Sequence, residues 1–542
     1  MPLGNLRQLW QEVSSTDNTG ESLRLVRAFL EAREVRPLSD DDEQALNHVY
    51  EWISAAALPS PVFAVTFDEA ADITDETQQA LDESRSISEH AIAVLVLLNK
   101  TLPIHKAANP SDPIVALASF TSTEDPWTTA DSFANATAAL QLYSQATGSE
   151  NEAALRSTLQ QILKEKIRPL FTRTRNPAIT GAGRRNFHPV PLARFDASIL
   201  DEEARPWKGS DLYASAVLEW IMAQYPVTDQ TYIEADFPFL VPTILALIDD
   251  TSLPFKTKGC HLLTQLLSPI RENKSDILRR TNLASVFEDA VTPCLLSLPT
   301  ITPEDISLKL LGAAYPALRA LFQTAYSPET NNEAYTTHMT KILRANLISS
   351  FHHISSSTPT SVATTTSASF PYPRLSTFLM EQVAVWVTEL RIHTTKYLQD
   401  LVPILYTTLS NPFGAAHPPL LLAAANATRA VVLNAHPRIW RWRGEILGGL
   451  CACWLHVLEE EREQKKKINS LDELKRALQG AAFLLKYALQ NPIAGADTSV
   501  DEEQKQAQES VEKELQALVD ADAELGDLLY ADVGSAGDDE RS

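Results

Sequence analysis

Two apolar helical segments joined by a short acidic turn are the feature that most constrains how this chain can fold. Residues 237–248 form the first segment and hold two prolines, Pro238 and Pro242, while residues 256–267 form the second. Asp249 and Asp250 follow the first segment, where a carboxylate can cap the next helix. Because a single hairpin cannot bury both of its apolar faces, the sequence predicts that such hairpins stack on one another.

Three further pairs of apolar segments repeat this arrangement in the second half of the chain. The pairs cover residues 286–298 with 308–322, 397–409 with 418–433, and 438–459 with 470–489. Pro293 and Pro403 lie in the first member of two of these pairs. A proline in the first helix, an acidic turn and an early basic residue in the second helix are typical of HEAT repeats. The spacing is irregular, so the sequence predicts an all-α fold, an irregular HEAT-like α-solenoid of stacked antiparallel helix pairs.

Helical periodicity also dominates the first 170 residues. Leu23, Val26 and Leu30 recur on one helical face, and this helix is expected to end before Pro37. Ser39 and the three aspartates after it are expected to begin the next helix, because acidic residues are favoured at the positive end of the helix dipole. Further helices are predicted over residues 86–101, 130–146 and 152–167, and no segments show the alternation expected of β-strands.

The charge balance bears on the partners of the chain. There are 46 Lys and Arg residues against 69 Asp and Glu residues, which gives a formal net charge of −23. Such a surface repels nucleic-acid backbones and anionic membranes, so neither is expected as a partner. The unbroken apolar run Ala91 to Leu98 is too short to span a bilayer, and the first ten residues carry no apolar signal segment. We expect a soluble, intracellular protein.

Three segments depart from the helical pattern. Residues 167–195 hold six arginines and no acidic residue, and they read either as a solvated linker or as a dock for an acidic segment. Residues 355–369 are eleven-fifteenths Ser or Thr and are expected to be a flexible insertion. Residues 497–542 hold fifteen acidic and three basic residues, with a partial helical stripe through Val511, Leu515, Leu518, Leu525 and Leu528. This acidic tail is either solubilising or a helix that folds on binding.

These observations give a domain organisation. The predicted parts are a helical region over 1–170, a basic loop over 171–209, HEAT-like repeats over 210–352, a Ser/Thr/Pro-rich insertion over 353–373, further HEAT-like repeats over 374–492 and the acidic tail over 493–542.

No pattern of residues points to catalysis. The four cysteines lie in apolar surroundings and have no second Cys or His pair at metal-binding spacing, so they are expected in the core of a reduced protein. His352 and His353 are expected to be an exposed pair. Walker A loops, HExxH pairs, EF-hand loops and nucleophile elbows are absent from the sequence. We therefore predict no catalytic, cofactor-binding or metal-binding residues and a protein that is not an enzyme.

A run of aromatic and basic residues is the candidate binding segment. It consists of Arg438, Trp440, Arg441, Trp442 and Arg443. Trp and Arg are the side chains that most often anchor protein interfaces. In a helix Trp440 and Trp442 would point about 200° apart, so one can pack inward while the other faces a partner. The alternative is Trp–Arg stacking inside the solenoid; nucleic acid is disfavoured by the net charge.

Several short pieces together resemble the fungal form of the second Tel-two-interacting protein family, which supplies the smallest subunit of the TTT co-chaperone complex. These pieces are residues 205–208, 255–260, 277–281, 286–289, 293–296, 314–318, 437–444 and 453–454. The residues that stand out in them as structural are Arg205, Trp207, Phe287, Asp289, Pro293, Tyr315 and Pro316. The resemblance covers roughly residues 200–460.

The resemblance implies a scaffold without a catalytic or cofactor site. Such a subunit would bind the first Tel-two-interacting protein and, through it, Tel-two. The complex would hand new phosphatidylinositol-kinase-related kinases, including TOR and the DNA-damage kinases, to a heat-shock chaperone, in the cytoplasm and the nucleus. The alternative is an unrelated HEAT-type protein-binding scaffold of the transport or phosphatase type.

Overall fold

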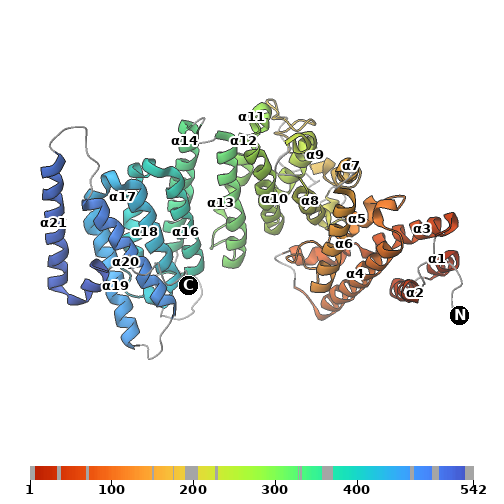
Figure 1. Ribbon diagram of the computed structural model, residues 1–542, viewed down its shortest axis with the longest axis horizontal. Helices are drawn as coiled ribbons and strands as arrows, with labels where there is room; N and C mark the ends of the chain where they lie inside the picture. The colour runs from red at the N-terminus through yellow and green to blue at the C-terminus, as the bar shows by residue number, and fades with distance from the viewer. Residues whose placement is uncertain are drawn as a thin grey trace. The chain divides into compact units, whose positions relative to one another are not determined.

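The computed structural model describes thirteen stretches of the chain. They are residues 6–16, 18–32, 38–68, 72–148, 152–174, 176–189, 205–225, 230–326, 329, 332–356, 370–463, 469–490 and 500–531. Within these stretches the regular elements are helices, and pairing of the β type is limited to one isolated bridge between Ile179 and Arg185. The all-α prediction is confirmed (Figure 1). The chain forms two compact units, Met1–Val291 and Thr292–Ser542, so the boundary falls inside the predicted repeat region 210–352.

Unit 1 contains twelve labelled α-helices among its described residues. They are α1 (Leu6–Ser15), α2 (Thr19–Ala32), α3 (Asp40–Ala57), α4 (Asp75–Thr101), α5 (Ser111–Ala118), α6 (Ala130–Gly148), α7 (Glu152–Gln161), α8 (Ala214–Ala223), α9 (Gln230–Ile248), α10 (Leu253–Glu272), α11 (Ile277–Thr281) and α12 (Ala284–Val291). Helices α2 and α3 both lie against α4, α4 and α5 lie against α6, and α9 lies against α10.

The predicted helix starts in unit 1 follow from their caps. The Ser39 side chain accepts a hydrogen bond from the backbone N–H of Asp42, and the Asp42 carboxylate accepts one from the Ser39 N–H, which is a complete capping box for α3. The segment predicted over 86–101 is the second half of the longer α4, and the segment over 130–146 is α6. The segment over 152–167 is α7 followed by a π-helical turn, Ile162–Ile167.

The hairpin that constrains the fold is present as α9 and α10. Gly259 lies where the two helices come closest, because a Cβ atom built there would be 2.8 Å from the backbone nitrogen of Ile248. The window Thr231–Ile248 is long and apolar enough by length and composition alone to cross a membrane, but 61% of it is buried in the structure. Its apolar residues therefore serve as the core of unit 1.

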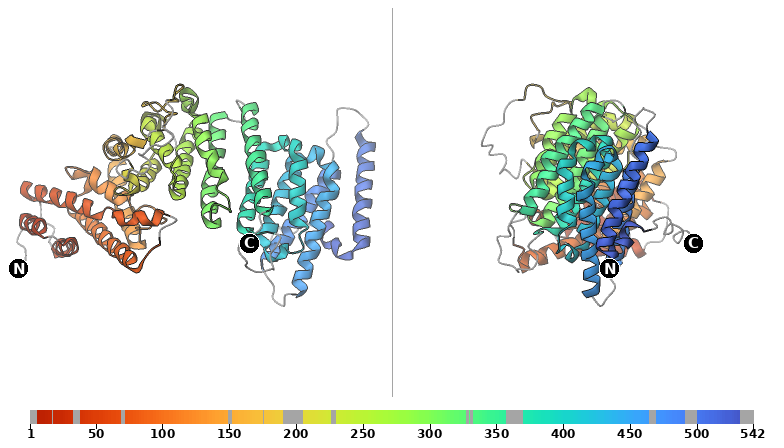
Figure 2. Two further views of the ribbon diagram at one scale, coloured as in Figure 1. Left: turned by 180° about the vertical axis from the view of Figure 1, so that it is seen from behind. Right: turned by 90° about the vertical axis from the view of Figure 1, so that its left-hand side faces the viewer.

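Unit 2 contains ten labelled α-helices among its described residues. They are α13 (Glu304–Tyr326), α14 (Asn332–Ile342), α15 (Ser349–Ser356), α16 (Pro373–Leu390), α17 (Leu398–Leu409), α18 (Pro418–Ile439), α19 (Arg443–Glu463), α20 (Asn469–Gln490), α21 (Val500–Ala521) and α22 (Gly526–Leu529). Helices α16, α18 and α20 lie side by side in one layer, and α17 and α19 lie side by side in a second (Figure 2). This is the predicted HEAT-like stacking of antiparallel helix pairs.

Two predicted helix boundaries are wrong. The segment 286–298 is not one helix, because α12 ends at Val291 and Pro293 lies in a 3₁₀ turn, Thr292–Leu296. Proline lacks the backbone N–H that would continue the helix, and its ring clashes with the preceding turn. The expected helix start at Arg438 is also wrong, because α18 continues to Ile439 and α19 begins only at Arg443.

The insertion and the tail are only partly described. Residues 357–369, which make up most of the predicted Ser/Thr insertion, lie outside the described residues. Within the tail, residues 500–531 form α21, a 3₁₀ turn (Ala523–Leu525) and α22. Val511, Leu515, Leu525 and Leu528 of the predicted stripe are buried. The described part of the tail therefore packs through an apolar stripe, and whether the tail is solubilising or folds on binding stays a prediction.

Candidate functional site

The first resemblance piece, residues 205–208, contacts a buried carboxylate. Asp250 has a fully buried side chain and accepts hydrogen bonds from Arg205 Nη1 at 2.8 Å and Lys208 Nζ at 3.0 Å. It also accepts the backbone N–H of Ser252 at 2.8 Å, which fixes the turn between α9 and α10. Two cations and one N–H compensate the loss of water around this carboxylate. The cluster holds α10 against the 3₁₀ turn Pro206–Lys208.

Aromatic side chains pack next to the Asp250 cluster. Trp207 is buried, stacks on Phe171 with ring centroids 5.2 Å apart, and meets Phe255 edge to face at 5.1 Å. Phe255 in turn stacks on Phe67 at 4.9 Å. Beside these rings Lys258 forms an ion pair with the buried Asp125. Such offset and edge-to-face contacts stabilise a core beyond the area they bury. Arg205 and Trp207 therefore belong to the framework of unit 1.

The remaining resemblance residues are divided between core and surface. Phe287 and Tyr315 are fully buried, and Tyr315 meets Trp386 edge to face at 5.9 Å. Pro316 is half-buried inside α13, whereas Asp289 and Pro293 are exposed. The structure thus gives Phe287 and Tyr315 packing roles and brings none of these residues together into a reactive group.

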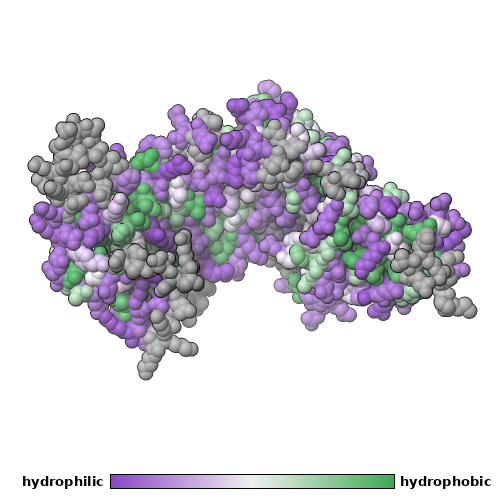
Figure 3. All heavy atoms as spheres, viewed as in Figure 1, coloured by the Kyte–Doolittle hydropathy of each residue, from purple (hydrophilic) through white to green (hydrophobic). Residues whose placement is uncertain are grey.

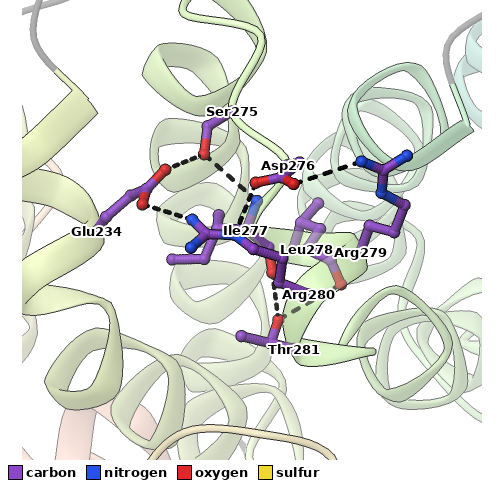
Figure 4. A network of polar contacts seen from close by, with 8 residues as sticks. All are labelled: Glu234, Ser275, Asp276, Ile277, Leu278, Arg279, Arg280 and Thr281. Atoms are coloured by element: carbon purple, nitrogen blue, oxygen red, sulfur yellow. Dashed lines mark hydrogen bonds and ion pairs between the residues drawn. The ribbon is translucent and has the colours of Figure 1, made fainter.

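A polar network fixes the short helix α11 to α9. Glu234 in α9 accepts hydrogen bonds from Ser275 Oγ and from Arg280 Nη2, the latter at 2.5 Å (Figure 4). Asp276 pairs with Arg280 at 2.6 Å and with Arg279 at 3.3 Å. The predicted piece 277–281 is therefore a turn that these contacts hold in place.

The basic loop is anchored to this network. The backbone N–H of Arg185 donates to Thr281 O at 3.0 Å, and Thr180 N donates to Arg184 O at 2.7 Å. Gly183 has φ of +66°, and a Cβ there would be 2.9 Å from Pro238 in α9. Residues 176–189 form a hairpin fixed by these backbone bonds, with Arg184 and Arg185 exposed, and both the linker and the docking interpretation stay predictions. The hairpin borders a cavity of about 290 Å³ between Asp249 and Asp289, and burial raises the pKa of Asp249.

The candidate binding segment forms the corner between α18 and α19. The 3₁₀ turn Trp440–Trp442 connects the two helices. Trp440 is 42% exposed, and its ring lies under the Arg443 guanidinium, whose carbon is 3.9 Å from the ring centroid. Trp442 is half-buried, while Arg438 and Arg441 are exposed. The corner thus holds one Trp–Arg stack at its surface and two exposed arginines, and its role in partner binding stays a prediction.

Arg443 also connects the corner to the tail. Its Nε and Nη2 atoms donate to the two carboxylate oxygens of Glu514 in α21, at 2.9 and 2.7 Å. This bidentate pair lowers the pKa of Glu514 and raises the pKa of Arg443, since each charge stabilises the other. The sequence pattern did not indicate this contact, because 71 positions separate the two residues.

Unit 2 also carries exposed apolar side chains on several of its helices and turns. Tyr406, Phe413, Leu433, Phe483 and Tyr487 are all exposed, and Phe483 stacks on Tyr487. Leu433 lies on α18 and Phe483 on its neighbour α20, where a Cβ atom built at Gly480 would be 3.6 Å from Arg429 Nε. On the face shown in Figure 3, hydrophobic residues gather over α17 and α18. Clustered exposed apolar side chains with an aromatic–Arg centre are typical of protein-binding surfaces.

The described residues offer little to hold a metal or to act as a nucleophile. Within the stretches described, no group of three or more His, Cys, Asp or Glu side chains is placed to hold a metal ion. His352 and His353 are both exposed. All four cysteines are buried and free of disulfides, and burial raises the pKa of Cys451 to about 11 and of Cys453 to about 12.

The fold defines the class of the protein: an irregular HEAT-like α-solenoid of stacked antiparallel helix pairs. Comparison with protein families gives the family itself. The model described as the Tti2 family matches residues 113–416, which is more than half of the chain, so the chain belongs to the Tti2 family. The predicted resemblance is confirmed, and the match ends before the Trp/Arg corner and the tail. Membership supports a role as a subunit of the TTT complex.

Comparisons with curated proteins and with solved structures say less about this chain than the family match does. No curated protein matches the chain. Among solved structures, importin β crystallised in a polyethylene glycol condition is similar at 12% sequence identity with a TM-score of 0.40. That alignment covers 95% of this chain and 61% of importin β, so the chain spans less than two thirds of the importin.

Proposed function

We propose that this protein is a non-catalytic adaptor subunit of the TTT complex. In this proposal unit 2 binds the larger helical-repeat partner, the first Tel-two-interacting protein, and through it Tel-two. The observation that carries the proposal is the family match over residues 113–416. An adaptor of this kind needs a long exposed surface and no closed pocket, which suits stacked helix pairs.

The Trp/Arg corner is the proposed centre of the partner surface. Trp440 offers a ring edge that is open to solvent, and Arg438 and Arg441 flank it as exposed cations. Exposed apolar side chains on α18 and α20, Leu433 and Phe483, extend the surface across two neighbouring helices. A central aromatic and arginine group surrounded by apolar side chains is the composition of an interface hot spot.

The proposal extends to what the complex does. The trimer would present newly made phosphatidylinositol-kinase-related kinases to a heat-shock chaperone, in the cytoplasm and the nucleus, as the family resemblance implies. The competing proposal is an unrelated HEAT-type scaffold of the transport or phosphatase type, which the family match disfavours.

Co-purification from cells tests the proposal. A tagged chromosomal copy should recover the first Tel-two-interacting protein and Tel-two. The double variant Trp440→Ala, Trp442→Ala should recover at least about tenfold less of both, because removal of a hot-spot side chain costs about 2 kcal/mol or more. Ile301→Ala is the matched control, since Ile301 is an exposed apolar residue of unit 2 away from the corner.

Two results would count against this proposal. Unchanged recovery with a double variant that gives a wild-type circular dichroism spectrum and melting temperature would remove the corner from the interface. Recovery of no large helical-repeat partner by the wild-type protein would favour the unrelated scaffold. The single variant Trp440→Ala guards against misfolding, because Trp440 is the more exposed of the two rings.

A further inference from the structure

The C-terminal segment 500–531 is an acidic amphipathic helix seated on the last repeat of unit 2. Helix α21 and the short helix α22 both contact α20. Their buried side chains are Val511 and Leu515 in α21, Leu525 in the connecting turn, and Leu528 and Leu529 in α22. These residues form an apolar stripe on a segment that is otherwise rich in carboxylates.

The surface beneath this segment is basic at matching positions. Arg443 and Arg462 of α19 pair with Glu514 and Glu524, and Lys486 of α20 pairs with Glu512 at 3.5 Å. We call these three cations with Trp454 and Gln479 the basic floor. Trp454 Nε1 donates to Glu524 O at 3.0 Å, and Gln479 Nε2 donates to Asp527 O at 2.9 Å. The floor therefore recognises both the charges and the backbone of the segment.

The segment is held more weakly than the helices below it. Its ion pairs with Arg443, Arg462 and Lys486 are all partly exposed, so each contributes about 0–1 kcal/mol. Over residues 509–521 of α21, where the burial of side chains is described, Val511 and Leu515 are the buried ones, whereas α20 buries apolar residues along its length from Leu471 to Leu489. Elements with few buried apolar contacts open locally before the rest of a structure does.

Opening of this segment would change the Trp/Arg corner. The Arg443 guanidinium lies on the Trp440 ring and is held at the same time by both oxygens of Glu514. Departure of α21 would leave Arg443 without the Glu514 carboxylate and would expose Val511 and Leu515, which are buried in the docked segment. Whether α21 occupies the basic floor therefore affects the Trp/Arg corner, because the Arg443 side chain contacts both Glu514 and Trp440.

We propose that the basic floor is a docking site for an acidic amphipathic helix of a partner protein, and that α21 occupies this site within the chain until the partner helix replaces it. The inference rests on the proposed function only for the identity of that partner. Charge complementarity determines the chemistry, because the three cations pair with carboxylates of α21 and its turn while Val511 and Leu515 are buried, and this arrangement selects a helix with carboxylates beside a Leu or Val stripe. The chain carries such a helix itself, which limits access to the site.

Binding of a labelled peptide of residues 500–531 tests the proposed site without any other TTT subunit. The peptide is titrated by fluorescence anisotropy against the full chain and against the full-length variant Val511→Asp, Leu515→Asp, which should release α21 and leave the floor intact. The released variant should bind the peptide at least about tenfold more tightly than wild type, and added salt should weaken binding. Adding Arg443→Glu to the released variant should reduce the gain, because it replaces an attractive ion pair with a repulsive one, whereas Arg476→Glu, on an exposed position of α20, should keep it.

Several results would overturn the proposal. Equal peptide affinity for the wild-type chain and the released variant would show that α21 does not occupy a competitive site. A gain that is undiminished with Arg443→Glu would remove the floor cations from recognition. Dimerisation of the wild-type chain through exchange of α21 would assign the site to a second copy of the chain. None of these results bears on co-purification of the TTT subunits. The docking-site proposal can therefore fail while the proposed function holds, and the reverse is also possible.

Discussion

Gly259 is the residue at which the packing of the main hairpin leaves no room. Any Cβ atom would lie 2.8 Å from the Ile248 nitrogen and 2.7 Å from its side chain, and the backbone of α9 cannot move aside cheaply. We expect Gly259→Ala to lower the free energy of unfolding by about 1–3 kcal/mol, as overpacking does in other cores. Urea denaturation followed by circular dichroism measures this.

Gly312 in α13 is the matched control for this substitution. No heavy atom lies within 4 Å of a Cβ built there, so Gly312→Ala should raise the unfolding free energy by about 0.5–1 kcal/mol through its better helix propensity. Equal effects of the two substitutions would contradict the close approach of α9 and α10.

The buried cysteines give a second prediction at the residue scale. The pKa of Cys451 is raised to about 11 and that of Cys453 to about 12, because burial disfavours the thiolate. At about pH 8 both thiols should stay protonated and resist iodoacetamide, since the thiolate is the reacting form. Mass spectrometry should find them unmodified in the native protein and modified in urea. Rapid alkylation of the native protein would contradict their burial.

At the scale of elements, the Asp250 cluster should be among the strongest single contributions to the stability of unit 1. Asp250→Ala would leave Arg205 and Lys208 without their buried carboxylate, which costs about 3–5 kcal/mol in comparable ion clusters. Asp305→Ala is the control, because Asp305 pairs with Arg374 on the surface and should contribute less than about 1 kcal/mol. Thermal unfolding compares the two, and similar losses would argue against the buried cluster.

The docking of α21 should depend on pH. The pKa of Glu514 is lower in the folded protein than in the unfolded chain because Arg443 stabilises the carboxylate. Its contribution is therefore present above the unfolded pKa, about 4.5, and is lost as pH falls through the lower folded pKa. Hydrogen-exchange protection factors of α21 should fall in this range, and Glu514→Gln should lower them already at neutral pH. Protection that is unchanged in Glu514→Gln would contradict a role for the ion pair.

The sequence predicted the positions of helices better than it predicted which distant residues contact each other. Apolar periodicity and the Ser39 cap predicted α3, and the paired stripes predicted α9 and α10, because local patterns determine these elements. The Trp/Arg corner was predicted as part of a helix, since no cap or proline stood between Arg438 and Glu459. The contacts of Arg205 with Asp250 and of Arg443 with Glu514 join residues 45 and 71 positions apart. Periodicity carries no information about such pairs.

At the scale of the whole molecule, the family match and the candidate surface cover different parts of the chain. The match to residues 113–416 includes the buried clusters of unit 1 and the first helices of unit 2. The Trp/Arg corner, the basic floor and α21 all lie beyond it. Packing residues therefore identify the family, while the proposed contacts to partners come from the C-terminal repeats.

The central claim is that this chain works by binding another helical-repeat protein and needs no cofactor to do so. Purified chain and purified first Tel-two-interacting protein, mixed without nucleotide, metal or kinase client, can be followed by analytical ultracentrifugation. We predict a stable complex of both proteins, with hydrogen-exchange protection of residues 438–443 in unit 2. Separate sedimentation of the two proteins, or a complex that leaves unit 2 unprotected, would contradict the account.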